Sequence, residues 1–370
     1  MSKLTKQVIA GIFLHLWKLT GYRVQKITQF ADSDNLKNIA IFSTTALGDF
    51  LINTPAIRAI KMRWPEAKII LVMNQRNKLL AEDSEIFNEV LYWNGKANGV
   101  VSLVKILRKH CIDATFLLHS RSPYDIVTAS MARSPIILKD VYYNDYLGRD
   151  RFYLDNFLSA HYDNRIKGNL HLIRQKTELL ESVGIKTPSL EMFIPIPFTV
   201  EKTQQCIIGI HAGASSQERC WPAQNFTQLI QHIMAKYPAI EIRLIGGPGE
   251  QDLNKKIIDG LEGDFHQVTN LAGKTNLKQL VENVASFACL VVGDTGPYHV
   301  AIATRTPVIG LLATQMHVDG VNPLQDQEKH FIIKAKDEEK GIVTIPINDV
   351  FVAIECCIAT MPSFNKMMGN

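Results

Sequence analysis

The sequence lacks the cysteine patterns that mark disulfide frameworks and structural zinc sites. Its six cysteines include no CxxC pair, and no group of cysteine and histidine residues has zinc-ligand spacing. This usage is typical of a protein kept in a reducing, cytosolic compartment. We therefore expect neither disulfides nor a metal site.

The sequence also has little net charge and no apolar run long enough to cross a bilayer. A formal charge of +4 is too small to indicate nucleic-acid binding by itself. The apolar residues of 8–17 are too few for a span and are interrupted by His15. No small-residue cleavage site follows them, so we expect no signal peptide. With 46% hydrophobic and 21% charged residues, the composition is that of a globular protein.

Residues 1–35 form a basic segment that has two interpretations. They hold five lysines and arginines against two aspartates. Their apolar residues recur at helical spacing: Val8, Ile9, Ile12, Phe13, Leu16, Leu19 and Tyr22. One interpretation is an amphipathic helix that lies on an anionic membrane face. The other, slightly favoured, is a helix packed on the body of the protein, because helical stripes usually serve a core.

Residues 36–195 alternate between strand and helix patterns. Short apolar runs predict strands over 39–42, 68–73 and 114–118, and helical periodicity predicts helices over 50–64, 100–109 and 171–183. Such alternation indicates a parallel sheet with crossover helices. Residues 120–168 are less regular and rich in arginine. Residues 187–203 contain three prolines and are the best candidate for a linker.

The second half repeats this alternation without a close sequence repeat. Strands are predicted over 206–210, 241–245, 288–292 and 307–312, and helices over 225–236, 276–285, 297–303 and 345–358. We predict an α/β protein with two Rossmann-like, doubly wound domains facing a central cleft. Its parts would be an N-terminal extension (1–35), two domains (36–195 and 196–345) and a closing helix and tail (346–370). Ligands of such sheets bind where strands end and loops begin.

The loop after the first predicted strand ends in Gly48 and Asp49, just before a helix. Gly48 would let the backbone turn tightly. Asp49 suits two roles. It could cap the helix, which any aspartate can do there and which the spacing favours. It could instead act as a general base on an acceptor hydroxyl.

The loop over 211–222 carries small residues at Gly213, Ala214 and Ser215, followed by Arg219. Exposed backbone amides and an arginine suit a diphosphate, although no GK[ST] follows as it would in a P-loop. An ordinary surface loop with Trp221 in the core explains the pattern equally well.

Two later loops also follow predicted strands. In 246–250, glycines allow a ligand to approach and Glu250 suits ribose hydroxyls, although a tight turn with a capping glutamate is slightly favoured. In 293–299, Thr295 and Gly296 open a helix, which makes an anion site. Asp294 would cap that helix or bind a donor hydroxyl. His299 suits contact with phosphate or a hydroxyl, although a lone histidine more often has a structural role.

These blocks stand in one order along the chain: GD, GAS…RxWP, GGPxE, LAGKTxLxxL and GDTGPxHxAxAxxTPVIGL. The set resembles glycosyltransferase family 9, which contains the ADP-heptose:lipopolysaccharide heptosyltransferases. The resemblance covers about residues 38–312, and the block over 270–312 is its most specific part. Any single block alone would be a weak signal.

The resemblance implies a GT-B fold and a metal-independent, inverting transfer. It implies that the C-terminal domain binds the nucleotide sugar and the N-terminal domain the acceptor, and that no cofactor is needed beyond a donor such as ADP-heptose. Asp49 matches the family's proposed catalytic base, which reverses the odds that spacing alone gives. The expected donor-binding residues are Gly213, Ala214, Ser215, Arg219, Glu250, Asp294, Thr295, Gly296 and His299. Many members have lysine where this chain has Arg219, followed by Cys220.

The expected acceptor is an anionic glycolipid, such as inner-core lipopolysaccharide, bound by Arg121, Arg149 and Arg151. A solvated surface explains those arginines equally well. Expected partners include the cytoplasmic face of the inner membrane but no nucleic acid, and the expected location is the cytoplasm. Two alternatives remain: a GT-B enzyme with another donor or acceptor, as in capsule or protein glycosylation, and a silent sugar-nucleotide-binding subunit.

Overall fold

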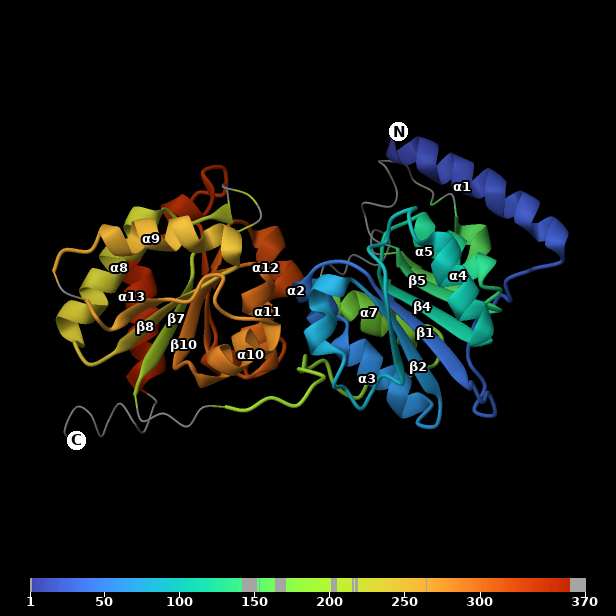
Figure 1. Ribbon diagram of the computed structural model, residues 1–370, viewed down its shortest axis with the longest axis horizontal. Helices are drawn as coiled ribbons and strands as arrows, with labels where there is room; N and C mark the ends of the chain where they lie inside the picture. The colour runs from blue at the N-terminus through green and yellow to red at the C-terminus, as the bar shows by residue number, and fades with distance from the viewer. Residues whose placement is uncertain are drawn as a thin grey trace. The chain divides into compact units, whose positions relative to one another are not determined.

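The computed structural model (Figure 1) describes residues 2–141, 152, 154–163, 171–200, 205–214, 216, 219–263 and 265–359. The chain divides into two compact units, Met1–Glu191 (unit 1) and Met192–Asn370 (unit 2). The division falls within the proline-containing segment 187–203, of which residues 201–203 lie outside the described residues.

Unit 1 is built around a six-stranded parallel sheet. Its strands are β1 (Asn38–Ser43), β2 (Lys68–Met73), β3 (Glu89–Tyr92), β4 (Ala114–His119), β5 (Ile136–Val141) and β6 (Ala160–Asp163). They lie in the order β3-β2-β1-β4-β5-β6, and each neighbouring pair is parallel. The central strands are apolar on both faces because helices cover both. The order reverses between β1 and β4, so the loops after these strands open at the edge where such sheets bind ligands.

The helices of unit 1 differ from the prediction over residues 50–64 and over residues 124–131, where no helix was predicted. They are α1 (Lys3–Trp17), α2 (Leu47–Ile52), α3 (Thr54–Arg63), α4 (Val100–Lys109), α5 (Tyr124–Met131) and α7 (Leu172–Glu181), with short 3-10 turns at Lys18–Thr20, Gln75–Leu80 and Asp155–Phe157. The single helix predicted over 50–64 is wrong. Pro55, in the first turn of α3, has no N–H to donate, so the chain restarts as a second helix at Thr54. Gly48 is a buried residue of α2 rather than a tight turn.

The segment 120–168 is more regular than its composition suggests. It contains α5, β5 and β6, with residues 142–151, 153 and 164–168 outside the described part. The strand β5 was missed because Lys139 and Asp140 interrupt its apolar run, yet both are buried. Strand β6 has only four residues, and three of them are not fully buried.

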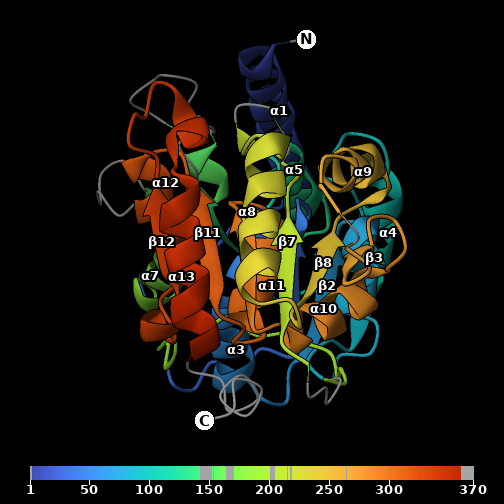
Figure 2. The ribbon, with the colours of Figure 1, turned by 90° about the vertical axis from the view of Figure 1, so that its left-hand side faces the viewer.

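Unit 2 repeats the architecture with a second parallel sheet (Figure 2). Its strands are β7 (Ile207–His211), β8 (Glu241–Ile245), β9 (Val268–Asn270), β10 (Cys289–Gly293), β11 (Val308–Leu312) and β12 (Phe331–Lys334). They lie in the order β12-β11-β10-β7-β8-β9. All the strands predicted in this half are present, and the short strands β9 and β12 are additional.

The helices of unit 2 cover both faces of its sheet. They are α8 (Ala223–Lys236), α9 (Gln251–Asp259), α10 (Leu277–Ser286), α11 (Gly296–Ala303), α12 (Gln315–Val321) and α13 (Ile347–Ala359), with 3-10 turns at Pro248–Glu250, Gln327–Lys329 and Gly341–Thr344. Figure 2 shows α8 and α13 side by side in front of the strands. Leu229, Ile233 and Ile354 from these helices join Ile208 and Ile210 of β7 in one core. Burial of each such side chain stabilises the fold by about 1.5–3 kcal/mol.

Candidate functional site

Asp49 lies at the carboxyl edge of the unit 1 sheet, in the first turn of α2. Ala46, not Asp49, is the N-cap residue, and the Asp49 carboxylate accepts a hydrogen bond from the Ala46 amide at 3.0 Å. Asp49 therefore lies three residues after the N-cap, and it does not occupy the N-cap position that the spacing favoured. Its other carboxylate oxygen is 3.5 Å from Nε2 of His119, the last residue of β4. The Asp49 side chain is 28% exposed, so solvent and substrate can reach it.

The surroundings of Asp49 keep it ionised. Burial opposes its charge, but His119, Thr45, the Ala46 amide and Lys176 together hold the pKa of the carboxyl below its usual value. Burial lowers the pKa of His119, and the nearby carboxylates raise it by less. The pKa of His119 is therefore below its usual value. Near neutral pH the pair is therefore a carboxylate beside a neutral imidazole, which leaves the carboxylate able to accept a proton.

Two buried ion pairs lie behind this edge. Lys139 Nζ is 2.7 Å from Asp125 and Lys176 Nζ is 2.6 Å from Asp140, and all four side chains are almost wholly buried. Sequence reasoning missed both pairs, and it also missed His119. The available signal was a charged or titratable residue inside or directly after an apolar run, because such a residue needs a partner when buried.

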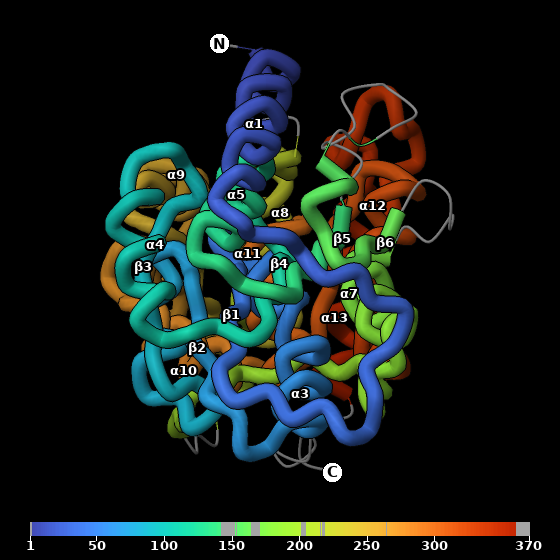
Figure 3. The backbone as a smooth tube through the Cα atoms, turned by 90° about the vertical axis from the view of Figure 1, so that its right-hand side faces the viewer, coloured from blue at the N-terminus to red at the C-terminus, as the bar shows by residue number. Residues whose placement is uncertain are grey.

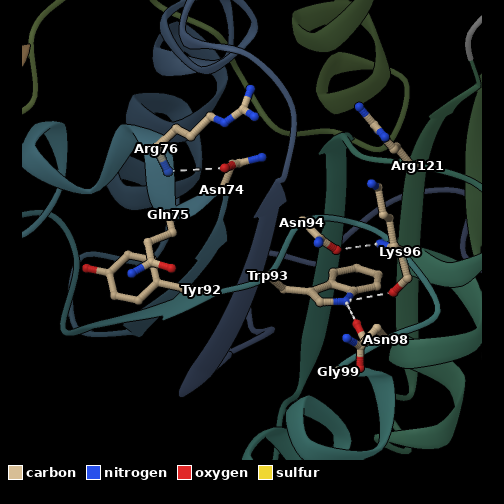
Figure 4. A pocket seen from close by; sticks show the side chains of 10 residues that line it. All are labelled: Asn74, Gln75, Arg76, Tyr92, Trp93, Asn94, Lys96, Asn98, Gly99 and Arg121. Atoms are coloured by element: carbon tan, nitrogen blue, oxygen red, sulfur yellow. Dashed lines mark hydrogen bonds between the residues drawn. The ribbon is translucent and has the colours of Figure 1, made fainter.

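Arg121 lines a pocket of about 500 Å³ at the same edge (Figure 4). The lining residues come from the end of β3 and from the segments after β2, β3 and β4: Asn74, Gln75, Arg76, Tyr92, Trp93, Asn94, Lys96, Asn98, Gly99 and Arg121. Figure 4 shows Arg76 and Arg121 on opposite sides, with Trp93 and Asn94 between them. Three of these described residues are cationic, four are amides and none is acidic. The pocket therefore suits an anionic, hydroxyl-rich ligand.

The loop that forms one wall of this pocket is held in place. The indole of Trp93 donates to the carbonyls of Lys96 and Asn98 at 2.9 and 3.1 Å. Gly95 has a φ of +72°, and a Cβ there would come within 2.8 Å of Thr44 Oγ1. The close approach joins the pocket wall to the loop that leads to Asp49. Arg149 and Arg151, the other arginines predicted to bind the acceptor, lie outside the described residues.

In unit 2, His211 brings three of the predicted loops together. It ends β7, and its Nε2 is 3.3 Å from the Glu250 carboxylate of the loop after β8. Its Nδ1 is 3.2 Å from the Thr295 hydroxyl in the loop after β10. Sequence reasoning did not assign His211 a role, because nothing in its local pattern shows contacts between loops far apart in the chain.

Glu250 closes over Gly213. Its carboxylate accepts a hydrogen bond from the Gly247 amide at 2.6 Å, and a Cβ on Gly213 would lie 1.6 Å from its oxygen. Only glycine is accommodated at 213 in this arrangement. Burial opposes the charge of Glu250, but His211 and the Gly247 amide hold its pKa below the usual value. Ala214 is described and half-buried, whereas Ser215 lies outside the described residues.

Asp294 does not cap α11 as the sequence suggested, because the N-cap residue is Thr295. Arg219 donates to both the carbonyl and the carboxylate of Asp294, at 2.7 and 2.5 Å. The buried ring of His299 lies 3.5 Å from the other carboxylate oxygen. Burial raises the pKa of Asp294, but His299, Arg219 and His317 lower it by more. The pKa is therefore below its usual value, and the carboxyl is ionised.

The start of α11 presents the groups expected of an anion site. Gly296 is its first residue and Pro297 follows in the first turn, so the amide of Gly296 needs no partner within the helix. Because Arg219 offsets the charge of Asp294, that carboxylate does not make the helix start repulsive to an anion.

The indole of Trp221, in the loop after β7, is buried in the core and donates to the Ile345 carbonyl. The interpretation of this segment as a surface loop expected Trp221 in the core.

The described residues hold neither a metal-binding cluster nor a membrane-spanning helix. No group of three or more His, Cys, Asp or Glu side chains there is arranged to hold a metal ion. None of the helices in the described part is both long and apolar enough to span a membrane.

Comparison with known proteins gives a family match. Glycosyltransferase family 9 (heptosyltransferase) matches residues 152–342. Lipopolysaccharide heptosyltransferase 3 of Escherichia coli K12 is 25% identical over 292 residues, which are 73% of this chain and 81% of that protein. Lipooligosaccharide heptosyltransferase 2 of Haemophilus influenzae is 24% identical over 302 residues, 74% and 82% of the two chains.

Solved structures show the same fold. A family 9 glycosyl transferase from Veillonella parvula gives a TM-score of 0.74 at 17% identity and covers 90% of this chain and 100% of its own. The E. coli ADP-heptose LPS heptosyltransferase II gives 0.71 at 18% identity, covering 87% and 98%. These likenesses confirm the predicted GT-B class of two Rossmann-like units. The family match spans just over half of the chain, and the chain therefore belongs to glycosyltransferase family 9, the heptosyltransferase family.

Proposed function

We propose that the protein transfers a heptose from ADP-heptose to an inner-core acceptor of lipopolysaccharide, with inversion at the anomeric carbon. Family membership supports the transfer, and the relatives are named lipopolysaccharide or lipooligosaccharide heptosyltransferases. A solved E. coli relative, WaaC, carries ADP in one structure and ADP-2-deoxy-2-fluoro heptose in another. The observation that carries the mechanism is Asp49, an ionised and accessible carboxylate at a ligand-binding sheet edge.

In this proposal Asp49 is the general base. It takes the proton of an acceptor hydroxyl as that oxygen attacks the anomeric carbon, and the bond from this carbon to the diphosphate breaks, which releases ADP. Attack from the face opposite the diphosphate inverts the configuration. His119 is a positioning residue, because it contacts the carboxylate rather than the substrate.

We assign the donor to the C-terminal domain, residues 196–345. The amides of Gly213, Ala214 and Gly296, with Thr295 and His299, would bind the diphosphate, and Glu250 would accept hydrogen bonds from the ribose hydroxyls. Arg219 and the start of α11 would stabilise the departing diphosphate without a metal ion. Asp294 holds Arg219 at this place. Ser215 remains a predicted member of this set, and no cofactor is proposed beyond the donor.

We assign the acceptor to the N-terminal domain, residues 36–195. The pocket beside Arg121 is lined by cations and amides and adjoins the loop before Asp49. A phosphorylated core sugar has the charge and hydroxyls that such a lining binds. Arg149 and Arg151 remain predicted acceptor ligands. The proposal places the enzyme in the cytoplasm, with peripheral contact to the inner membrane that supplies the glycolipid.

The test is turnover by an Asp49→Asn variant. The change keeps the size and the Ala46 hydrogen bond but removes the base, so kcat with ADP-heptose and truncated lipopolysaccharide should fall by about 10²–10⁴-fold. ADP affinity should stay within about twofold, because Asp49 does not bind the donor in this proposal. Released ADP and the mass of the product are the measurements.

The matched control is Asp32→Asn, at an exposed aspartate of the same unit. It should keep full turnover. Near-normal turnover by Asp49→Asn would rule out the base. A wild-type enzyme that uses a different nucleotide sugar, or none, would rule out the heptosyl transfer itself.

A further inference from the structure

Helix α1 turns its more apolar face away from the protein. Gln7, Ala10 and Leu14 are its buried residues. Six large apolar side chains along α1 and the turn after it are exposed, with Ile12 at 59%, Leu16 at 60% and Leu19 at 83%. The six are Val8, Ile9, Ile12, Phe13, Leu16 and Leu19, called the outer face below. A helix that only serves a core would bury this face and expose the other.

Helical geometry places the outer face in one continuous strip. At 3.6 residues per turn, its six residues fall within an arc of roughly 140°, opposite the buried residues. Figures 1 and 3 show α1 at the rim of unit 1, on the outer side of α5. The strip is therefore one exposed apolar surface rather than scattered single residues, and contiguous surfaces of this kind mark binding sites.

The body of unit 1 holds α1 in this orientation. The Trp17 indole donates to the Ser130 carbonyl at 3.1 Å, and the buried Tyr22 hydroxyl donates to the Ser134 carbonyl at 2.7 Å. Leu14 is 1% exposed in the core of the unit. These contacts anchor the buried side, so α1 cannot rotate to hide the outer face without breaking them.

The charge around α1 points to a partner of negative sign. Residues 1–31 contain five lysines and arginines and no acidic residue. Lys3, the first residue of α1, and Arg23, beyond its C-terminal end, are exposed. At the C-terminal end of α1, the Arg108 guanidinium lies over the Trp17 ring and Arg133 donates to the Thr20 carbonyl. A second copy of the chain would bring equal cations together and be repelled, whereas an anionic lipid surface attracts them.

We propose that α1 docks unit 1 on an anionic lipid bilayer, with the outer face among the acyl chains and the basic residues at the headgroups. Docking of this kind would lie within the interfacial layer and not span the bilayer. The inference deepens the membrane contact of the proposed function, but it uses no residue of the proposed transfer site. A failed transfer assay and a failed docking assay are therefore distinguishable.

The test is co-sedimentation of the full-length protein with vesicles of phosphatidylcholine, with and without phosphatidylglycerol. The wild type should bind the anionic vesicles, and high salt should weaken binding because each basic residue near the surface strengthens it by about fivefold. Ile12→Ser with Leu16→Ser should weaken binding by about tenfold for each side chain. The stability of the fold should not change, because both residues are exposed.

The matched control is Met62→Ser with Val101→Ser, at apolar residues of 60% and 61% exposure elsewhere on unit 1. It removes the same kind of surface and should bind like the wild type. Equal loss in both variants, equal binding to neutral vesicles, or no binding at all would overturn the proposal. So would a concentration-dependent dimer, seen by sedimentation velocity, that Ile12→Ser with Leu16→Ser abolishes.

Discussion

The two units share a strand order and support their carboxyl edges differently. Counted within each unit, both sheets run third, second, first, fourth, fifth and sixth strand. In unit 1 the ion pairs Lys139–Asp125 and Lys176–Asp140 lie buried behind the edge. In unit 2 the pair Arg219–Asp294 is at the edge itself, with side chains 33% and 20% exposed.

The difference shows how one topology produces two kinds of carboxylate. Asp49 lies beside a neutral histidine, and a buried lysine also helps to hold its pKa down, so it stays ionised yet able to take a proton. Arg219 donates to the backbone carbonyl and to one carboxylate oxygen of Asp294, which offsets the charge of that carboxylate and leaves the helix start beside it suited to an anion. The fold determines where each site lies, and the neighbouring charges determine what each carboxylate can do.

The largest expected effect is on stability, from breaking a buried pair of unit 1. Lys139→Met leaves Asp125 as an uncompensated buried charge and should lower the free energy of unfolding by about 3–5 kcal/mol. Urea unfolding followed by tryptophan fluorescence measures it, since Trp17, Trp64 and Trp93 lie in unit 1.

The control for this prediction is Lys334→Met in unit 2. Lys334 pairs with Glu338 at 2.9 Å, but both side chains are more than a third exposed. Its loss should change stability by less than about 1 kcal/mol. If the two variants lose equal stability, the contrast between buried and edge charges is wrong.

The next effect separates the ligands of the two units. Arg121→Gln should raise KM for the acceptor by about tenfold and leave the donor KM unchanged, because it removes one charge-assisted contact in the unit 1 pocket. Arg219→Gln should do the reverse, since it also releases the Asp294 carboxylate beside the proposed diphosphate site. Steady-state kinetics with each substrate varied in turn measures both constants.

Each arginine variant is the control for the other. A rise in both constants for either variant would mean that its unit does not bind one ligand alone. Unchanged constants for Arg121→Gln would leave the pocket without a role in acceptor binding.

The smallest effect concerns the pH dependence of turnover. Because its surroundings hold the pKa of Asp49 below the usual value of about 3.9, kcat/KM should not fall through this group between pH 7 and about 5. His119→Gln removes a neighbour that lowers that pKa, so the acid limb should move to higher pH. At pH 7 Asp49 stays ionised, and kcat should change by about threefold or less.

The control histidine is His110, which pairs with Glu89 at 3.0 Å in the same unit. His110→Gln should leave the acid limb where it is. An unmoved limb in His119→Gln would show that His119 does not influence the ionisation of Asp49.

Much of the fold was predictable because long apolar runs and helical periodicity are local signals. The strands β1, β2 and β4 and all the central strands of unit 2 were found in this way. Strand β5 was missed because its lysine and aspartate are buried only through partners on α5 and α7. Strands β3, β6, β9 and β12 are short and half-buried, which leaves little pattern to read.

The sequence allowed candidate residues to be named but not their arrangement. The ordered motif blocks predict roles for Asp49, Glu250, Asp294 and His299, because the resemblance carries their positions. It did not show that His119 contacts Asp49 or that His211 joins two loops. Those contacts connect parts of the chain that are dozens of residues apart, and only strand order brings them together.

The sequence by itself determined the family, the two α/β units and the apolar and basic character of residues 1–35. Hydrophobic periodicity and motif order are properties of the chain, so they need no tertiary information. Only the tertiary structure decided which face of α1 is buried, which partner each carboxylate has and which arginines line a pocket. The reason is physical: burial and pairing depend on neighbours that folding supplies from elsewhere in the chain.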